Sequence, residues 1–236
     1  ALSAYCLLKK TPISLKLMLP FNKEIKRFTV MIFNLFVRTL ALNVTLYFAS
    51  AFSTSYGKQY IAAYTIAINL WFLGAFIIDG YASAGNILSG KLLGGKEYGK
   101  LITLSNKLIR YGVYLGVFLA LLGSLFYYFI GTVFTKEPEV LKEFYNIFWM
   151  VLAMQPFCAI AFIFDGMFKG LGKMKDLRNL LLFSTFFVFV PILFWLDSLD
   201  LKLYAIFIAF TCWIMARGFP LIIKFRKEFL PLSQKH

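Results

Sequence analysis

Three ionisable side chains interrupt long apolar stretches of the sequence: Arg38, Asp79 and Asp165. A charge inside a membrane-crossing segment is costly, and it usually pairs with another charge or marks the path of an ion or substrate. Arg38 lies about 16 Å of helix rise from Arg27, and Asp79 lies about 18 Å from Lys91. These similar depths predict an ion pair between Arg38 and Asp79, either as a latch between two helices or as part of substrate or proton handling.

Polar side chains also follow one face of each of the first two apolar segments, at spacings of about one helical turn. They are Asn34 and Arg38 on the first segment, with Thr39, Asn43 and Ser50 on an adjacent stripe, and Asp79, Ser83 and Asn86 on the second segment. Such stripes avoid lipid, so they form either a seam between helices or the wall of a water-filled cavity.

Asp165 stands four residues before Lys169, near the end of its apolar segment. This spacing predicts a carboxylate at a helix end that pairs with Lys169 or with a base in a neighbouring loop. Gln155 lies deeper, beside Pro156, and we expect it to line the cavity. Pro156 removes a backbone donor and predicts a kink in its helix.

The elements that carry these residues are membrane helices. Of the 236 residues, 60% are hydrophobic and only 15% are charged, which leaves too little polar surface for a soluble globule. Because backbone groups in lipid must be satisfied within the chain, long apolar runs indicate helices. The sequence predicts an all-α integral membrane bundle of six helices, at 28–55, 60–92, 108–131, 144–168, 180–196 and 203–223. A polar stretch, 97–107, is expected to form an interfacial helix before the third.

Basic residues alternate between the two sides of these segments. Lys58, Lys136, Lys142 and Lys202 are the only bases in one set of loops, whereas the other set holds nearly all the remaining Lys and Arg, with Arg217 counted among them. Because bases are enriched on the cytoplasmic side, the C-terminus is predicted to be cytoplasmic. The net charge of +14 therefore indicates contact with membrane lipid, and no nucleic-acid partner is expected.

The predicted organisation has four parts. Residues 1–8 would end a preceding transmembrane helix, because eight residues are too few to cross a bilayer. Residues 9–26 would form a cytoplasmic connector, 27–223 the six-helix lobe, and 224–236 a cytoplasmic tail. We expect no enzyme activity and no cofactor or metal site, because no catalytic triad, metal-spaced cysteine set or phosphate loop is present.

Several short motifs, in this order, resemble the MATE (multidrug and toxic compound extrusion) transporters, specifically their DinF-like branch. The motifs are Arg38-Thr39-Leu40, Ile61-Ala62-Ala63-Tyr64, Asp79-Gly80-Tyr81-Ala82, Gly90-Lys91-Leu92-Leu93-Gly94-Gly95, Gln155-Pro156, Asp165-Gly166 and Gly170-Leu171-Gly172. The resemblance implies the C-terminal lobe of a twelve-helix antiporter in a bacterial inner (plasma) membrane. Its partners would be the N-terminal lobe and a small cationic or amphipathic substrate.

The resemblance also implies that H⁺ or Na⁺ drives export and binds mainly in the N-terminal lobe. Some branches carry a cation-binding carboxylate on the first helix of this lobe and another high in the fourth. Here the first helix has Arg38 instead and the fourth has Asp165 low down, so a sodium site in this lobe is not expected. The alternatives are a lipid-linked glycan flippase of the same superfamily, which would need several bases in its cavity, and a membrane assembly subunit or channel.

Overall fold

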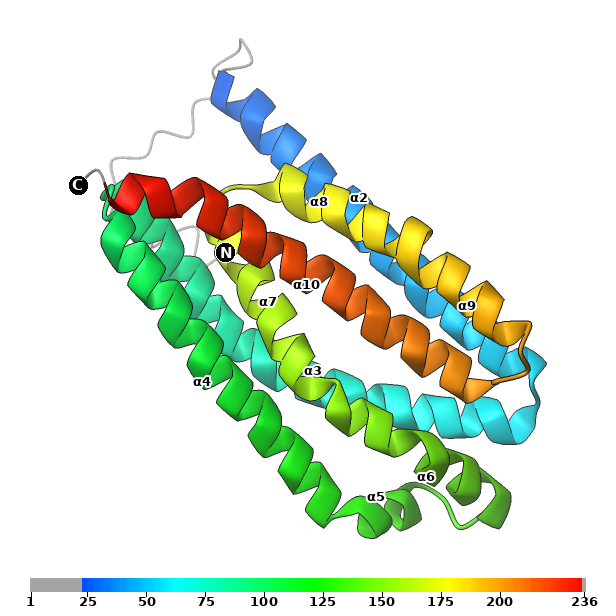
Figure 1. Ribbon diagram of the computed structural model, residues 1–236. Coiled ribbons are helices and arrows are strands. Elements are labelled where there is room, and N and C mark those ends of the chain that lie inside the picture. The colour runs from blue at the N-terminus through cyan, green and yellow to red at the C-terminus, as the bar shows by residue number, and fades with distance from the viewer. Residues whose placement is uncertain (1–22, 235–236) are drawn as a thin grey trace, which may run out of the picture. The chain divides into compact units, whose positions relative to one another are not determined.

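The computed structural model describes residues 23–234, which are helical almost throughout and contain no strand (Figure 1). The elements are α2 (Lys23–Ser55), α3 (Lys58–Gly94), α4 (Tyr98–Leu125), α5 (Tyr127–Phe134), α6 (Pro138–Ala153), α7 (Gln155–Gly170), α8 (Met174–Phe183), the π-helix η1 (Ser184–Phe189), α9 (Val190–Asp197) and α10 (Leu203–Ser233). Five helical stretches of the described part are long and apolar enough to cross a membrane, and α6 with α7 makes a sixth if the bent pair counts as one span. The chain is therefore a multi-pass membrane protein, and the predicted all-α bundle is confirmed.

The chain divides into two compact units at Phe33 and Asn34, within α2. In the first unit, the described residues are the opening turns of α2, where the Thr29 hydroxyl donates to the carbonyl of Ile25 at 3.0 Å. The second unit holds the rest of α2 and all later helices, and it contains every contact described below. The predicted segments 1–8 and most of 9–26 lie outside the described residues.

Two predicted boundaries differ from the structure. The stretch 97–107 is not a separate interfacial helix, because α4 runs unbroken from Tyr98 to Leu125. Similarly, α10 continues through Pro220 to Ser233, so most of the predicted tail is helical. Bases and glutamates at these positions are good helix formers, and polarity alone did not distinguish a solvated helix from a loop.

The fourth span breaks where the sequence predicted a kink. The α6 helix ends at Ala153, α7 begins at Gln155, and their axes differ by 48°. Pro156 occupies the first turn of α7, where its lack of a backbone N–H is tolerated.

Close backbone contact joins α3 to α7. A Cβ added to Gly170 would lie 2.0 Å from the carbonyl oxygen of Asn86, and one added to Gly166 would lie 2.5 Å from that of Ala82. Only glycine fits at such distances, so these two residues let the helices approach as small residues do in membrane bundles. Asp165, next to Gly166, is thereby fixed at a packed helix interface.

The fifth span lies beside the part of α2 that begins at Asn34 and beside the turn that follows α2 (Figure 1). Near one end, Arg178 Nη1 donates to Asn34 Oδ1 at 2.6 Å. In the middle, Thr185 of η1 and Thr45 share a hydrogen bond of 3.1 Å between their hydroxyls. At the other end, Tyr56 donates to Asp197 Oδ1 at 2.5 Å.

Candidate functional site

The largest group of charges inside the bundle centres on Asp165 of α7. Arg38 of α2 donates a hydrogen bond from Nη2 to Asp165 Oδ2, and the two side chains are only 12% and 8% exposed. The predicted pairing of Arg38 with Asp79 is therefore wrong. Helix rise fixes the depth of a side chain but not the neighbour that it faces, and α2 turns Arg38 toward α7.

Lys169, one turn beyond Asp165 on α7, also binds this carboxylate. Its Nζ lies 3.4 Å from Asp165 Oδ2, as the four-residue spacing predicts. Asp165 is thus shared by two bases from two helices. Charge-assisted bonds of this kind are what allow a carboxylate to remain buried.

A third base, Arg217 of α10, lies in the same region and is 97% buried. Its Cζ is 4.9 Å from the ring centroid of Phe162, which lies three residues before Asp165 on α7, and 4.9 Å from that of Trp213. Its charge acts on both Asp165 and Asp79. Cation–π contact with two rings stabilises a desolvated guanidinium by about 2 kcal/mol or more.

Arg217 is not among the residues predicted from the sequence, because it was counted with the bases of the cytoplasmic loops. The signal was nevertheless present: Arg217 falls inside the apolar run 203–223, by the same criterion that singled out Arg38. The structure places it within α10 against α7, with Gly218 beside it in close contact with Ala161.

Two further predicted residues are buried at packed interfaces. Asn34 accepts a hydrogen bond from Arg178 and so ties α2 to α8. Gln155 packs against Gly74 of α3, and its Oε1 has no hydrogen-bond donor among the described residues. Neither side chain joins the cluster around Asp165.

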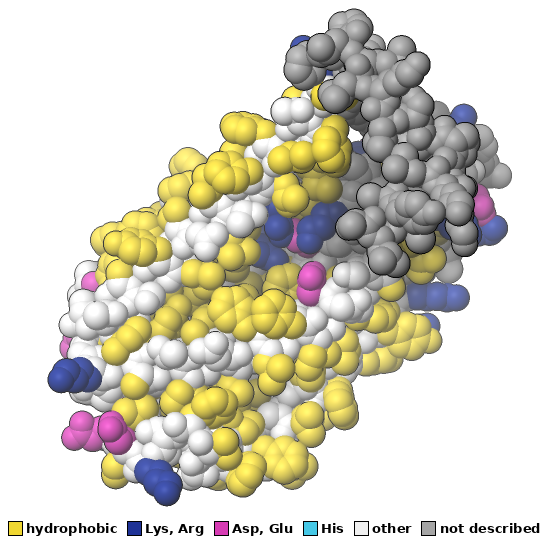
Figure 2. Space-filling model, turned by 180° about the vertical axis from the view of Figure 1, so that it is seen from behind, with side chains coloured by type: hydrophobic (Ala, Val, Ile, Leu, Met, Phe, Trp, Pro, Cys, Tyr) yellow, Lys and Arg dark blue, Asp and Glu magenta, His cyan; other side chains and the backbone are white. Residues whose placement is uncertain are grey.

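The remaining predicted residues lie on exposed or partly exposed helix faces. Asp79 and Ser83 of α3 and Asn43 of α2 are exposed, whereas Asn86 is half-buried. Ser83 and Asn43 donate to carbonyls of their own helices, at 2.9 Å each. Asp79 makes no ion pair with any described residue. Figure 2 shows basic and acidic side chains in a recess of a face that is otherwise largely hydrophobic.

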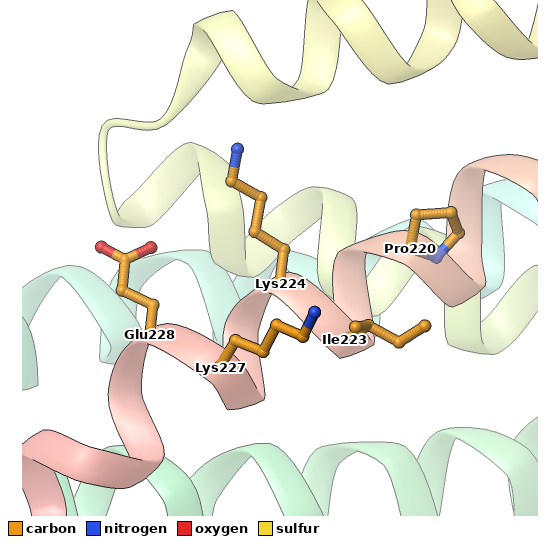
Figure 3. A pocket seen from close by; sticks show the side chains of 5 residues that line it. All are labelled: Pro220, Ile223, Lys224, Lys227 and Glu228. Carbon is orange, nitrogen blue, oxygen red and sulfur yellow. The ribbon is translucent and has the colours of Figure 1, made fainter.

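A groove of about 480 Å³ runs along α10 and is lined by that helix alone (Figure 3). Lys224 and Glu228 in its wall already pair with Asp176, at 2.7 Å, and with Lys173. These pairs hold α10 to the beginning of α8. The groove therefore presents few free polar groups to a ligand, and within 23–234 no three acidic, His or Cys side chains gather to hold a metal ion.

Comparison with known proteins agrees with this architecture. The model of the MatE family matches residues 31–195. The chain is 30% identical over 135 residues to Protein DETOXIFICATION 45, chloroplastic, of Arabidopsis thaliana, covering 57% of this chain and 24% of that protein. It is 28% identical over 138 residues to Protein DETOXIFICATION 42 of the same plant, covering 58% and 27%.

Among solved structures, a MATE protein in the bent conformation superimposes with a TM-score of 0.87 at 19% sequence identity, over 98% of this chain and 52% of the other. The chain thus spans about half the length of that protein, and the part that aligns with the plant proteins spans about a quarter of theirs. The matched region includes Arg38, Asp79 and Asp165 and covers more than half of the sequence, so the chain belongs to the MatE family.

Proposed function

We propose that this chain forms the C-terminal half of a secondary active transporter that exports organic cations and other amphipathic compounds in exchange for protons or sodium. Its membership of the MatE family and the half-length match to a MATE protein support this proposal. The observation that carries it is the exposed carboxylate of Asp79 in the middle of an apolar helix.

A carboxylate in contact with acyl chains would be strongly destabilising, so Asp79 faces protein or water in the membrane. Ser83, one turn away on α3, is exposed as well. We propose that these two residues, with Asn43 of α2, belong to the wall of a substrate cavity that the N-terminal lobe completes. A negative charge in a low-dielectric wall attracts cations, and exposed aromatic side chains such as Phe76 add cation–π contacts.

The proposal extends to coupling and location. We assign the chain to the DinF-like branch, and we place the main proton- or sodium-coupling acid in the N-terminal lobe. The reason is that Asp165, the one buried carboxylate among the described residues, is already shared by two bases. We propose the inner membrane of a bacterium, with the C-terminus in the cytoplasm.

The test is dye efflux by the complete protein that contains this sequence. It is expressed in cells that lack their own multidrug pumps, and the accumulation of ethidium is followed with and without a protonophore, in the presence and absence of sodium. We expect lower accumulation that collapses when the driving gradient is removed. A protein that reaches the membrane but leaves the accumulation of a panel of organic cations unchanged would contradict the proposal.

One observation favours the flippase as a second candidate. A lipid-linked phosphate needs several bases, and three of them, Arg38, Lys169 and Arg217, gather around Asp165. Family membership keeps the drug transporter first. Transport of a fluorescent lipid-linked substrate by the same protein in liposomes, without dye efflux, would reverse the order.

A further inference from the structure

The guanidinium of Arg217 is buried with its hydrogen-bonding capacity unused. Nε, Nη1 and Nη2 are all inaccessible, and none of them has an acceptor among the described residues. The rings of Phe162 and Trp213 attract its positive charge. However, they provide no in-plane acceptor for its five N–H groups. A buried donor without an acceptor is strongly unfavourable, so a bound acceptor group at this position would be stabilising.

The residues around Arg217 provide fewer hydrogen-bond acceptors than N–H donors. Asp165 is the carboxylate at the centre of the cluster, and its Oδ2 already binds both Arg38 and Lys169. Arg38 Nε is a fourth buried nitrogen without an acceptor in the described part of the chain. Three cations therefore lie around Asp165, and the exposed Asp79 of α3 is the second carboxylate whose charge acts on Arg217. Positive charge still exceeds negative charge at the most buried point of the cluster.

We infer that this cluster is a binding site for an oxyanion, a carboxylate or phosphate group, which Arg217 holds together with Arg38 and Lys169. A planar guanidinium binds such a group through two parallel N–H···O bonds, a geometry that lysine does not match. The inference goes beyond the proposed function, because the oxyanion would bind at this cluster regardless of which compound the protein exports.

The exposure of the cluster gives the direction of entry. The side chains become more accessible from Asp165, 8% exposed, through Arg38, 12%, to Lys169, 27%. An anion therefore meets Lys169 first and then reaches the deeper guanidinium groups. Asp165 repels it along this path and so limits its affinity.

The test is binding by the complete protein in nanodiscs of neutral phosphatidylcholine. Thermal unfolding and titration calorimetry are measured with succinate, with inorganic phosphate and with chloride at matched ionic strength. We expect succinate or phosphate to raise the unfolding temperature above the chloride control. Arg217→Gln should weaken binding about tenfold or more, since it removes the positive charge and the two parallel N–H donors of the guanidinium. Arg217→Lys should retain part of the affinity, because it keeps the charge.

The matched control is Arg110→Gln, which removes an exposed arginine of α4 outside the cluster and should bind as the wild type does. Asp165→Asn should tighten binding, because the competing carboxylate is gone. If anionic phospholipid in the nanodisc abolishes the effect of added succinate and phosphate, the oxyanion is a lipid headgroup; if the effect persists, it belongs to a solute.

The inference is overturned if neither anion binds better than chloride in neutral nanodiscs, or if Arg217→Gln binds as tightly as the wild type. Both readouts are made without transport, so a failure of dye efflux leaves them unaffected. Arg217→Gln removes three buried nitrogens that have no acceptor among the described residues, and we therefore expect the variant to fold.

Discussion

Arg38 on α2 and Asp165 on α7 are 127 positions apart in the sequence, yet they form a buried ion pair inside the bundle. The pair links the first span to the bent fourth span, and Lys169 shares its carboxylate. It thus joins helices that the order of the sequence does not make neighbours.

We expect Arg38→Ala to lower the free energy of unfolding by about 3 kcal/mol, because the change leaves a buried carboxylate with one weaker partner. The double variant Arg38→Ala/Asp165→Ala should lose less than the sum of the single changes. The measurement is a double-mutant cycle from unfolding of the complete protein in mixed micelles. The same cycle with Asp79 in place of Asp165 should be additive; coupling there and none at Asp165 would contradict the structure.

Gly170→Ala should destabilise the bundle by about 2–3 kcal/mol, because the new Cβ would lie 2.0 Å from the carbonyl oxygen of Asn86 and the helices would have to separate. Gly80→Ala, in the middle of α3, is the control, since its Cβ would have nothing within 4 Å. That control should be neutral or stabilising by up to about 1 kcal/mol. Equal midpoints for both variants in thermal unfolding would refute the close contact of α3 and α7.

Asp79→Asn should leave the unfolding temperature unchanged and slow dye efflux about tenfold. The side chain is exposed and makes no ion pair with a described residue, so folding does not depend on it. The binding of a cation in the cavity does depend on this negative charge. The measurement is the initial efflux rate at equal amounts of protein in the membrane. Glu97→Gln, which removes an exposed partner of Lys100, is the control and should export at the wild-type rate. Wild-type efflux by the Asp79 variant would remove this carboxylate from the proposed cavity.

Tyr56 provides a pH-dependent test in the turn between α2 and α3. Burial, followed by its hydrogen bond to Asp197, raises the pKa of Tyr56 above its ordinary value of 10.0. A raised pKa means that the folded state holds the proton more tightly, so the contribution to stability is complete below about pH 10 and is lost as the pH rises further. Tyr56→Phe should therefore cost about 1 kcal/mol at neutral pH.

The measurement is the difference in unfolding free energy between the wild type and Tyr56→Phe from pH 7 to pH 11. This difference should stay constant to about pH 10 and then shrink. Lys202, whose pKa is raised chiefly by its hydrogen bond to Tyr60, is untouched by the change and contributes equally to both proteins. A difference that grows with pH would rule out the raised pKa of Tyr56.

The spans could be predicted from the sequence because polar groups are costly to bury in lipid, so each membrane-crossing segment is a long run of apolar residues. The break at Pro156 was equally readable, since proline removes a local donor. The rotation of each helix could not be read, and it decides which neighbour a side chain meets. Arg38 therefore pairs with Asp165 and not with the predicted Asp79. Arg217 lies within α10, although its closeness in sequence to other bases had placed it in a loop.

The π-helix η1 has a consequence for how the fifth span fits against α2. Arg178 and Asp197 lie nineteen positions apart, which would point them about 100° away from each other on a straight α-helix. The wide turn takes up one residue, and so it cancels about that angle. Both ends of the span, and Thr185 between them, thereby face α2 or the turn directly after it. Removal of a single residue from 184–189 would put these two ends out of phase, and only one of them could keep its hydrogen bond, to Asn34 of α2 or to Tyr56 in the turn after α2.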